Sequence, residues 1–232
     1  YRSQRRGGRG LQGAKAKEED FVEHLFVANT HDYILFFTDK GKCYWLKVHE
    51  IPPGGRAARG RAIVNLLGTE PGEKVKAFVS VKTFDEEKFI IMATRKGRIK
   101  KTKLSAYGKP RKGGIYAIDI REGDELIEAK ITNGENDIVL GTREGKSIRF
   151  PETDARPMGR KTRGVIGIKL SKKDDYVVGM VVVRREGTLL VATEKGFGKR
   201  TEVMQYRIQK RSGKGVLAMR TNKKVGKMVA IM

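Results

Sequence analysis

Several residue types are scarce in this chain, and each scarcity excludes a class of protein. The 232 residues contain one cysteine, Cys43, so an intramolecular disulfide framework is excluded. Only three histidines accompany it, His24, His31 and His49, which are too few for a zinc site of the usual kind. No apolar run approaches the roughly 20 residues that span a bilayer, and no signal peptide is evident. We therefore expect a metal-free protein of a reducing cytoplasm.

Acidic residues are also few, and this imbalance indicates the partner. There are 27 Asp and Glu against 50 Lys and Arg, which gives a formal net charge of +23 and a pI of about 10.2. A solvated surface alone leaves most domains within a few charges of neutrality, so such self-repulsion calls for a polyanion. Nucleic acid is the first candidate and an anionic membrane surface the second. The sequence contains neither a membrane anchor nor a basic amphipathic helix, so membrane binding has no support beyond the charge.

Catalytic constellations are missing from the sequence as well. It contains no Gly-x-x-x-x-Gly-Lys-Ser/Thr loop and suggests no Ser/His/Asp or Cys/His arrangement. The carboxylate pairs Glu86-Glu87 and Asp174-Asp175 lie in polar turns, where we expect solvated loop residues. No residue is assigned a catalytic role, and we expect the chain alone not to be an enzyme.

What the chain does contain is an internal repeat. Four short β-branched or aliphatic runs, at 34–37, 90–93, 138–141 and 189–192, each end in Thr-x-x-Gly, with the threonines at Thr38, Thr94, Thr142 and Thr193. Runs of four residues are too short for helices, and a glycine turn directly after them predicts a β-hairpin.

A second glycine follows each of these turns at a nearly constant distance. These landmark glycines are Gly60, Gly113, Gly164 and Gly215, and one more period back leads to Gly10, so that neighbours are 50 to 53 residues apart. An apolar stretch follows each, such as Ala62-Ile63-Val64, and then a last strand, such as 75–81 or 176–183. The first copy lacks its front half, so we expect a fragment of a longer protein.

Units of about 50 residues with roughly four short strands and no helical periodicity predict an all-β propeller-like array. We expect one domain over residues 1–232, with a partial blade at 1–32 and blades at 33–83, 88–133, 137–183 and 188–232. A β-sandwich and tandem small barrels are the alternatives, but neither predicts such regular phasing. Trp45, the only tryptophan, lies in a strand context and is expected in the core.

Basic residues gather just before each landmark glycine, three in each unit. Since residues of equal phase occupy equivalent places in a radial array, they predict a continuous positive belt on a curved surface. The predicted DNA-binding residues are Gln4, Arg5, Arg6, Gly7, Gly8, Arg9 and Gly10, then Arg56, Arg59 and Arg61, then Lys109, Arg111 and Lys112, then Arg160, Lys161 and Arg163, then Lys210, Arg211 and Lys214.

A second basic set follows the Thr-x-x-Gly turns and has a weaker claim to DNA contact, because a lysine on a half-exposed strand usually only aids solubility. This set consists of Lys42, Arg98, Lys100, Lys101, Lys146, Arg149, Lys199 and Arg200. Aromatic residues make up 7% of the chain and no Phe or Tyr is interleaved in the first set, so bases have little to stack on. Duplex DNA, read through its phosphates and deformability, is therefore the expected ligand.

The heptad Gln4-Arg5-Arg6-Gly7-Gly8-Arg9-Gly10 resembles the signature box of the C-terminal domain of DNA gyrase A, and the likeness extends over the whole chain. Further similar stretches are 27–32, 41–48 and 59–67. The resemblance implies a β-pinwheel, a propeller-like fold whose blades exchange strands, around whose basic rim DNA is wrapped. It also implies that all seven box residues serve this wrapping. The C-terminal domain of topoisomerase IV usually lacks an intact box, so the heptad favours gyrase over that alternative.

Further expectations come from the same resemblance. The partners implied are the rest of gyrase A and gyrase B, in an A2B2 assembly of the bacterial cytoplasm and nucleoid. ATP and Mg²⁺ are used by other parts of that enzyme when it introduces negative supercoils, so no cofactor is expected here, and the isolated domain is expected to be monomeric. A basic propeller that binds acidic proteins remains a third possibility; aromatic hot spots, which such an interface favours, are not evident in these loops.

Overall fold

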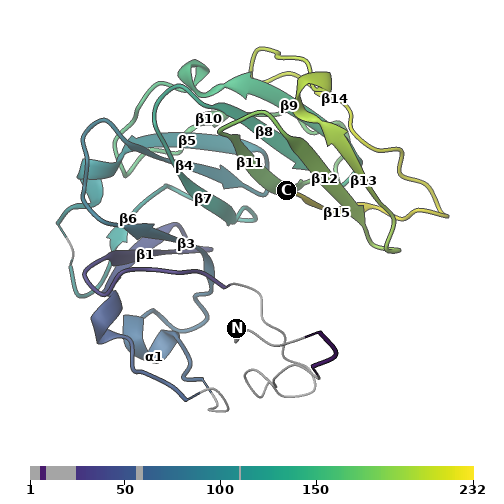
Figure 1. Cartoon of the computed structure of the whole chain (residues 1–232). Helices are drawn as coiled ribbons and strands as arrows, with labels where there is room; N and C mark the ends of the chain where they lie inside the picture. The colour runs from purple at the N-terminus through teal and green to yellow at the C-terminus, as the bar shows by residue number, and fades with distance from the viewer. Residues whose placement is uncertain (1–5, 9–24, 56–59, 110) are drawn as a thin grey trace.

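The computed structural model describes residues 6–8, 25–55, 60–109 and 111–232, and four antiparallel sheets account for its strands. The sheets lie one after another along an open arc (Figure 1). Their central hairpins are β1 (Tyr33–Thr38) with β2 (Lys42–Lys47), β4 (Phe89–Thr94) with β5 (Arg98–Lys103), β8 (Asp137–Thr142) with β9 (Lys146–Pro151), and β12 (Thr188–Thr193) with β13 (Gly198–Glu202).

All four Thr-x-x-Gly motifs form the turns of these hairpins, as the repeat predicts. The turn glycines Gly41, Gly97, Gly145 and Gly196 have φ values of 77° to 82°, a region that favours glycine. Each threonine is buried, and the hydroxyl oxygens of Thr38 and Thr94 accept a hydrogen bond at 3.2 Å from the first backbone N–H of the next strand. A short 3-10 helix follows each hairpin: η1 (Val48–Glu50), η2 (Leu104–Tyr107), η3 (Glu152–Asp154) and η4 (Val203–Gln205).

The inner edge of each sheet is a strand that comes later in the same repeat and pairs with the first strand of the hairpin. These inner strands are β3 (Val75–Val81), β7 (Leu126–Thr132), β11 (Val177–Val183) and β15 (Met228–Ile231). Figure 1 shows β7, β11 and β15 on the concave side of the arc.

The outer edge of the first three sheets is a two-residue strand donated by the following repeat. These donated strands, β6 (Ile115–Tyr116), β10 (Val165–Ile166) and β14 (Val216–Leu217), pair with β2, β5 and β9. In these three sheets the carbonyls of Gly41, Gly97 and Gly145 each accept two backbone N–H groups from the donated segment. Gly41, for example, accepts those of Ala117 at 2.8 Å and Ile118 at 3.1 Å. This exchange is the feature that distinguishes a pinwheel from a propeller with self-contained blades.

The fourth sheet has three strands, in the order β13-β12-β15. Within the described ranges no strand is donated to β13, and its residues Gly198–Glu202 are mostly exposed. The turn glycine Gly196 likewise has no atom within 4 Å of the place where a Cβ would stand, whereas an equivalent Cβ on Gly97 would lie 2.8 Å from the carbonyl oxygen of Ile168.

One local expectation is corrected by the structure. The landmark glycine of the second repeat is Gly114, not Gly113: Gly114, Gly164 and Gly215 share a φ of 70° to 76°, and a Cβ on Gly114 would lie 2.8 Å from the Tyr44 ring. Gly113 has open space around it. The close approach of the donated strand β6 to β2 therefore requires Gly114, the second glycine of the Gly113-Gly114 pair.

The apolar stretch after Gly60 forms a helix, α1 (Val64–Leu67), and not the strand that follows the other landmark glycines. A strand here would be donated to a preceding sheet, and the described residues before Tyr33 contain no strand to receive it. Leu67 instead packs with Ile34, Phe36 and Leu46 on one face of the first sheet.

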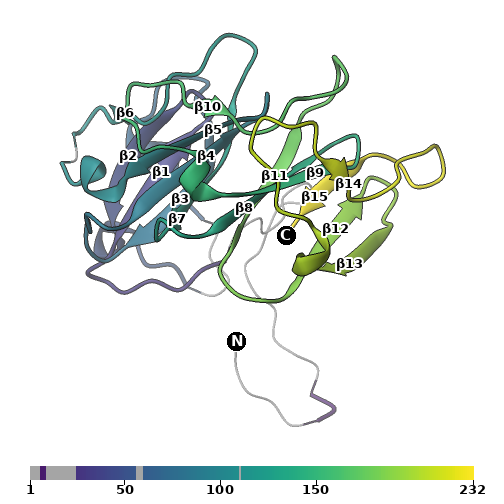
Figure 2. The ribbon, with the colours of Figure 1, turned by 90° about the horizontal axis from the view of Figure 1, so that it is seen from above.

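The core lies between successive sheets, which pack face to face (Figure 2). One cluster joins the first and second sheets around Phe37 and Met92, another joins the second and third around Ile99 and Phe150, and a third joins the third and fourth around Val139 and Val191. Both faces of the second and third sheets are thus covered, and their central strands β4 and β8 are almost continuously apolar. Trp45 packs against the first cluster and its Nε1 donates to the Tyr107 carbonyl at 2.8 Å, so it is a core residue as predicted.

Candidate nucleic-acid interface

The loops that lead into the donated strands lie on the outer side of the arc. We call them the rim loops: residues 108–114, of which residue 110 is not described, 156–164 and 207–215. Figure 1 shows β6, β10 and β14, into which they run, along the convex side. Backbone contacts to the preceding repeat fix two of them, since Met158 N donates to Lys101 O and Gln209 N to Arg149 O, both at 2.8 Å.

Most of the predicted DNA-binding residues of the rim loops are exposed. Lys109, Arg111, Lys112, Lys161, Lys210 and Lys214 are exposed, and Arg160, Arg163 and Arg211 are half-buried. Exposure leaves ammonium and guanidinium groups available to phosphate oxygens, for which arginine is especially well matched.

Neighbouring rim loops bring their cations together. Arg111 of the first loop lines a hollow of about 400 Å³ with Arg160 and Lys161 of the second. Arg163 of the second loop lines another with Lys214 of the third. Cations of successive rim loops thus line the same hollows, and the second hollow is also lined by Asp119, Glu122, Asp124, Asp174 and Asp175.

Two arginines of the rim loops also bind protein groups. Arg163 Nε lies 3.3 Å from Asp119 Oδ2, and both side chains are partly exposed. Arg211 donates from Nε to the Asp154 carbonyl at 2.9 Å and from Nη1 to the Ile166 carbonyl at 3.1 Å. These bonds orient the third rim loop against the preceding repeat.

The other predicted residues fall near the start of the chain and after η1. Arg6, Gly7 and Gly8 are exposed, Arg6-Gly7 forms a turn with φ of 86° at Gly7, and Arg61 is exposed. Gln4, Arg5, Arg9, Gly10, Arg56 and Arg59 lie outside the described residues.

Most residues of the second basic set have partners within the protein, and Arg98, Lys100, Lys101 and Arg149 contact the following repeat. Arg98 donates to the carbonyls of Arg163 at 3.3 Å and Gly164 at 2.8 Å, which ties the second rim loop to β5. Arg149 is buried, pairs with Asp137 at 2.7 Å and donates to the Val203 carbonyl at 2.9 Å. The remaining contacts are Lys42 to Glu70 at 2.5 Å, Lys101 to Glu152 at 2.9 Å and Lys146 to Ser171 at 3.0 Å. Only Lys199 and Arg200 fit the expectation of an outward, solvated charge.

Lys100 is fully buried, and its ammonium group donates to the backbone carbonyls of Ala117 and Arg160. Burial lowers the pKa of Lys100 to about 7, and the guanidinium of Arg160 acts in the same direction. The Lys100 side chain thus joins strand β5 to the backbone of the second rim loop at Arg160, whose own side chain is one of the cations of that loop.

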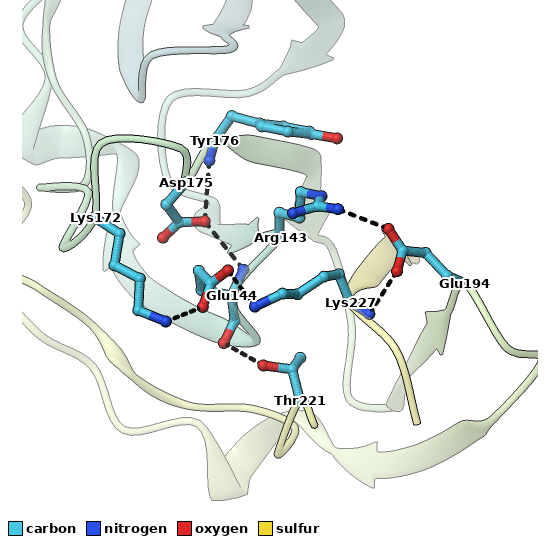
Figure 3. Close-up of polar contacts among 8 residues, drawn as sticks. All are labelled: Arg143, Glu144, Lys172, Asp175, Tyr176, Glu194, Thr221 and Lys227. Atoms are coloured by element: carbon cyan, nitrogen blue, oxygen red, sulfur yellow. Dashed lines mark hydrogen bonds and ion pairs between the residues drawn. The ribbon is translucent and has the colours of Figure 1, made fainter. Parts of the chain in front are cut away.

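An ionic network that the sequence did not predict connects the third and fourth repeats (Figure 3). Glu144 accepts Lys172 and Lys227, each at 2.5 Å, and Arg143 pairs with Glu194 at 2.9 Å. Lys172 and then Lys227 hold the pKa of Glu144 below its usual value. Both lysines thus share one carboxylate within the protein.

Asp175 corrects the prediction of solvated carboxylates. It is buried, and its Oδ1 accepts the backbone N–H groups of Glu144 at 3.0 Å and Tyr176 at 2.9 Å. Asp174, Glu86 and Glu87 are exposed as expected. Among the described residues no group of three or more His, Cys, Asp and Glu could hold a metal ion, and no helix is long and apolar enough to cross a membrane.

Comparisons with known proteins agree with this architecture. The family model described as "DNA gyrase C-terminal domain, beta-propeller" matches residues 1–29, 32–82, 88–133, 136–184 and 187–232. The DNA gyrase A protein of Clostridium acetobutylicum is 51% identical over the whole chain, which spans 28% of that protein's length.

Two solved structures have the same fold. The C-terminal domain of DNA topoisomerase IV has a TM-score of 0.79 at 26% identity, covering 88% of this chain and 64% of that one. The DNA gyrase A C-terminal domain has a TM-score of 0.77 at 23% identity, covering 96% and 75%. Because the family model matches almost the full length of the chain, the chain belongs to the DNA gyrase C-terminal domain family.

Proposed function

We propose that this chain binds duplex DNA without regard to base sequence and bends it around the outer side of the arc, as the wrapping domain of a DNA gyrase A protein. The observation that carries the proposal is that cations from successive rim loops line shared hollows, Arg111 with Arg160 and Lys161, and Arg163 with Lys214. Phosphates along a curved duplex meet such a surface repeatedly, whereas a compact ligand would meet only one loop.

The energies of bending and contact are of comparable size. Elastic estimates for a turn of roughly 180° over about 40 base pairs are on the order of 10 kcal/mol. About ten basic groups that each return roughly 1 kcal/mol through phosphate contact and counterion release would offset that cost. Affinity should therefore fall steeply with salt.

In the intact enzyme we infer that the rest of gyrase A and gyrase B complete an A2B2 assembly in the bacterial cytoplasm and nucleoid. The parts that use ATP and Mg²⁺ would convert the wrap into negative supercoils. We assign the chain alone no catalytic residue and expect it to be monomeric.

The test compares two variants that each lose two positive charges. Arg160→Ala with Lys161→Ala removes cations from the hollow between rim loops, and Lys82→Ala with Lys88→Ala removes exposed cations beside the inner strands. Binding of a 40-base-pair duplex is measured by fluorescence anisotropy at several salt concentrations. The rim variant should bind roughly tenfold more weakly, with a salt slope smaller by about 2.

The inner variant should keep both the affinity and the salt slope of the parent. Equal losses in the two variants would mean that net charge, and not the rim, determines binding. If the parent binds an acidic protein tightly and duplex DNA weakly and without bending, the propeller acts on acidic partners instead.

A topoisomerase IV-like role is favoured only by the fold, which the two solved domains share. The whole enzyme distinguishes them: a gyrase introduces negative supercoils into relaxed DNA with ATP, and neutralising Arg5, Arg6 and Arg9 should abolish this while relaxation persists. A whole enzyme whose supercoiling survives that change would contradict the role of the box.

A further inference from the structure

The donated strands carry an apolar residue on the outer surface of every sheet that has one. Tyr116, Ile166 and Leu217 are the second residues of β6, β10 and β14, and they are 54%, 39% and 57% exposed. The first residues of β6 and β10, Ile115 and Val165, pack against the core clusters, as alternation along a strand requires. In a chain with 50 basic residues, polar side chains would be the ordinary occupants of three such equivalent positions.

Cations surround each of these three side chains. Across the strand pair, the residues directly opposite are Lys42, Arg98 and Lys146. Directly opposite residues in an antiparallel pair present their side chains on the same face of the sheet. Each apolar group is therefore flanked by a positive one from the preceding repeat.

The rim loops contribute further cations at the same places. Tyr116 lines a hollow with Arg111, Arg160 and Lys161. Ile166 lies with Arg163 and Lys214 in the next hollow, whose lining also includes the acidic residues Asp119, Glu122, Asp124, Asp174 and Asp175. Leu217 lies with Arg220 in a third, where Lys172 is paired with Glu144. An exposed apolar side chain with basic residues beside it thus recurs three times along the convex side of the arc; the basic border is free of acidic residues only around Tyr116.

From this arrangement we propose that Tyr116, Ile166 and Leu217 contact the sugar edges of the minor groove where it faces the rim, and promote bending of the duplex at those points. The proposal rests on the function proposed above and adds the residues that read DNA shape. Apolar side chains in the minor groove favour opened, bent steps, while cations on either side hold the phosphates.

The chemistry of the three residues favours this occupant over others. Two of the three are aliphatic, so they offer no platform on which unpaired bases could stack. The cationic borders are complementary to a polyanion, and their recurrence in successive repeats matches a ligand that is itself periodic and curved. A contact of these side chains with the rest of gyrase A is the competing outcome.

The test replaces all three side chains with threonine, which keeps β-propensity and is shorter and polar. The control variant carries Leu190→Thr, Phe197→Thr and Val229→Thr, at similarly exposed apolar positions in the fourth sheet and in the turn between β12 and β13. Bending of a 40-base-pair duplex is followed by energy transfer between labelled ends, and affinity and salt slope by anisotropy. Thermal unfolding confirms that both variants are folded.

We expect the triple rim variant to lose most of the energy transfer and to bind about tenfold more weakly, with the salt slope of the parent. The control should behave as the parent does. If the rim variant bends DNA normally while Arg160→Ala with Lys161→Ala weakens binding, the apolar contact is refuted and the proposed function stands.

Two further results would also decide the matter. Should the parent itself fail to bind duplex DNA, the proposed function falls and the apolar contact with it. Should the rim variant bend DNA normally yet lose association with the remainder of gyrase A, the three side chains form a protein interface. Leu217→Thr alone, the most exposed of the three changes, provides a partial effect of the same sign if the triple variant unfolds.

Discussion

At the scale of single residues, basic side chains divide into those that point outward and those that bind carbonyls or carboxylates inside. Lys100 is the extreme case, because its buried ammonium has two backbone carbonyls as partners. Its position, third in β5, is occupied by Tyr44 in β2 and by Ile148 in β9. An uncharged side chain is therefore compatible with this place in the fold.

Lys100 predicts a pH dependence of stability. Its pKa is about 7 in the folded chain, against 10.5 as the ordinary value. Below pH 7 Lys100 is protonated in both the folded and the unfolded chain, so the folded chain bears the full cost of burying its charge. Between pH 7 and 10.5 the unfolded state holds more protons, so stability rises with pH. Relative to Lys100→Ile, the parent should gain on the order of 2 kcal/mol from pH 6 to pH 9.

Urea unfolding of both chains at pH 6, 7.5 and 9 measures this difference, and the other titrating groups cancel in the comparison. Parallel pH profiles for the parent and Lys100→Ile would show that Lys100 does not carry the effect.

Arg149 leads to a second prediction at this scale. Its guanidinium joins Asp137 at 2.7 Å to the carbonyls of Val203 at 2.9 Å and Tyr206 at 3.3 Å. Arg149→Lys keeps the charge but cannot span all three acceptors. We expect it to cost about 2 kcal/mol, and Arg149→Ala about 3–5 kcal/mol because Asp137 loses its partner. Arg200→Lys, on the exposed strand β13, is the control and should change the free energy of unfolding by less than about 0.5 kcal/mol.

At the scale of elements, the donated segment and the turn that receives it form one unit. The carbonyl of Gly145 accepts the N–H groups of Ala218 at 2.8 Å and Met219 at 3.0 Å. A Cβ on Gly145 would overlap the Met219 carbonyl oxygen, whereas one on Gly196 would meet nothing. The two glycines have φ of 82° and 77°, so the backbone strain of an alanine is the same at both.

This pair separates backbone strain from the fit between repeats. Gly196→Ala should cost about 1–2 kcal/mol, the ordinary penalty of a left-handed conformation. Gly145→Ala should cost about 2 kcal/mol more, because the donated strand must move. Chemical denaturation gives both values; equal costs would mean that the donated segment adapts freely.

The elements also show what the sequence can and cannot predict. Hairpins are predictable because Thr-x-x-Gly acts locally. The helix α1 and the choice of Gly114 depend on neighbours far along the chain, which periodicity does not describe. A signal for the buried cations does exist: Lys101 and Arg149 are fourth in their strands, as the core residue Trp45 is in β2. A comparison of residues at the same position in each hairpin would therefore have predicted that Lys101 and Arg149 are buried.

At the scale of the whole molecule, the arc is held by charged contacts as well as by its core. Glu125 accepts Lys76 at 3.0 Å and Arg95 at 2.9 Å, and the Arg95 guanidinium lies 3.7 Å from the centre of the Tyr176 ring. Tyr176 belongs to the third repeat, so these contacts connect the first three sheets. We expect these contacts to fix the angle between repeats, and with it the curvature of the rim.

This geometry predicts that bending and local binding can be separated. Arg95→Gln removes the ion pair and the cation–π contact while it leaves the rim loops unchanged. We expect unchanged affinity for a duplex of about 12 base pairs, which only a few phosphate contacts hold, and reduced energy transfer between the ends of a 40-base-pair duplex, which must follow the whole arc. Arg121→Gln, an exposed arginine whose loss removes the same charge, is the control and should keep the parent's bend. If both variants bend the long duplex equally well, the curvature of the rim does not depend on the contacts of Arg95, and the apolar core alone sets the angle between sheets.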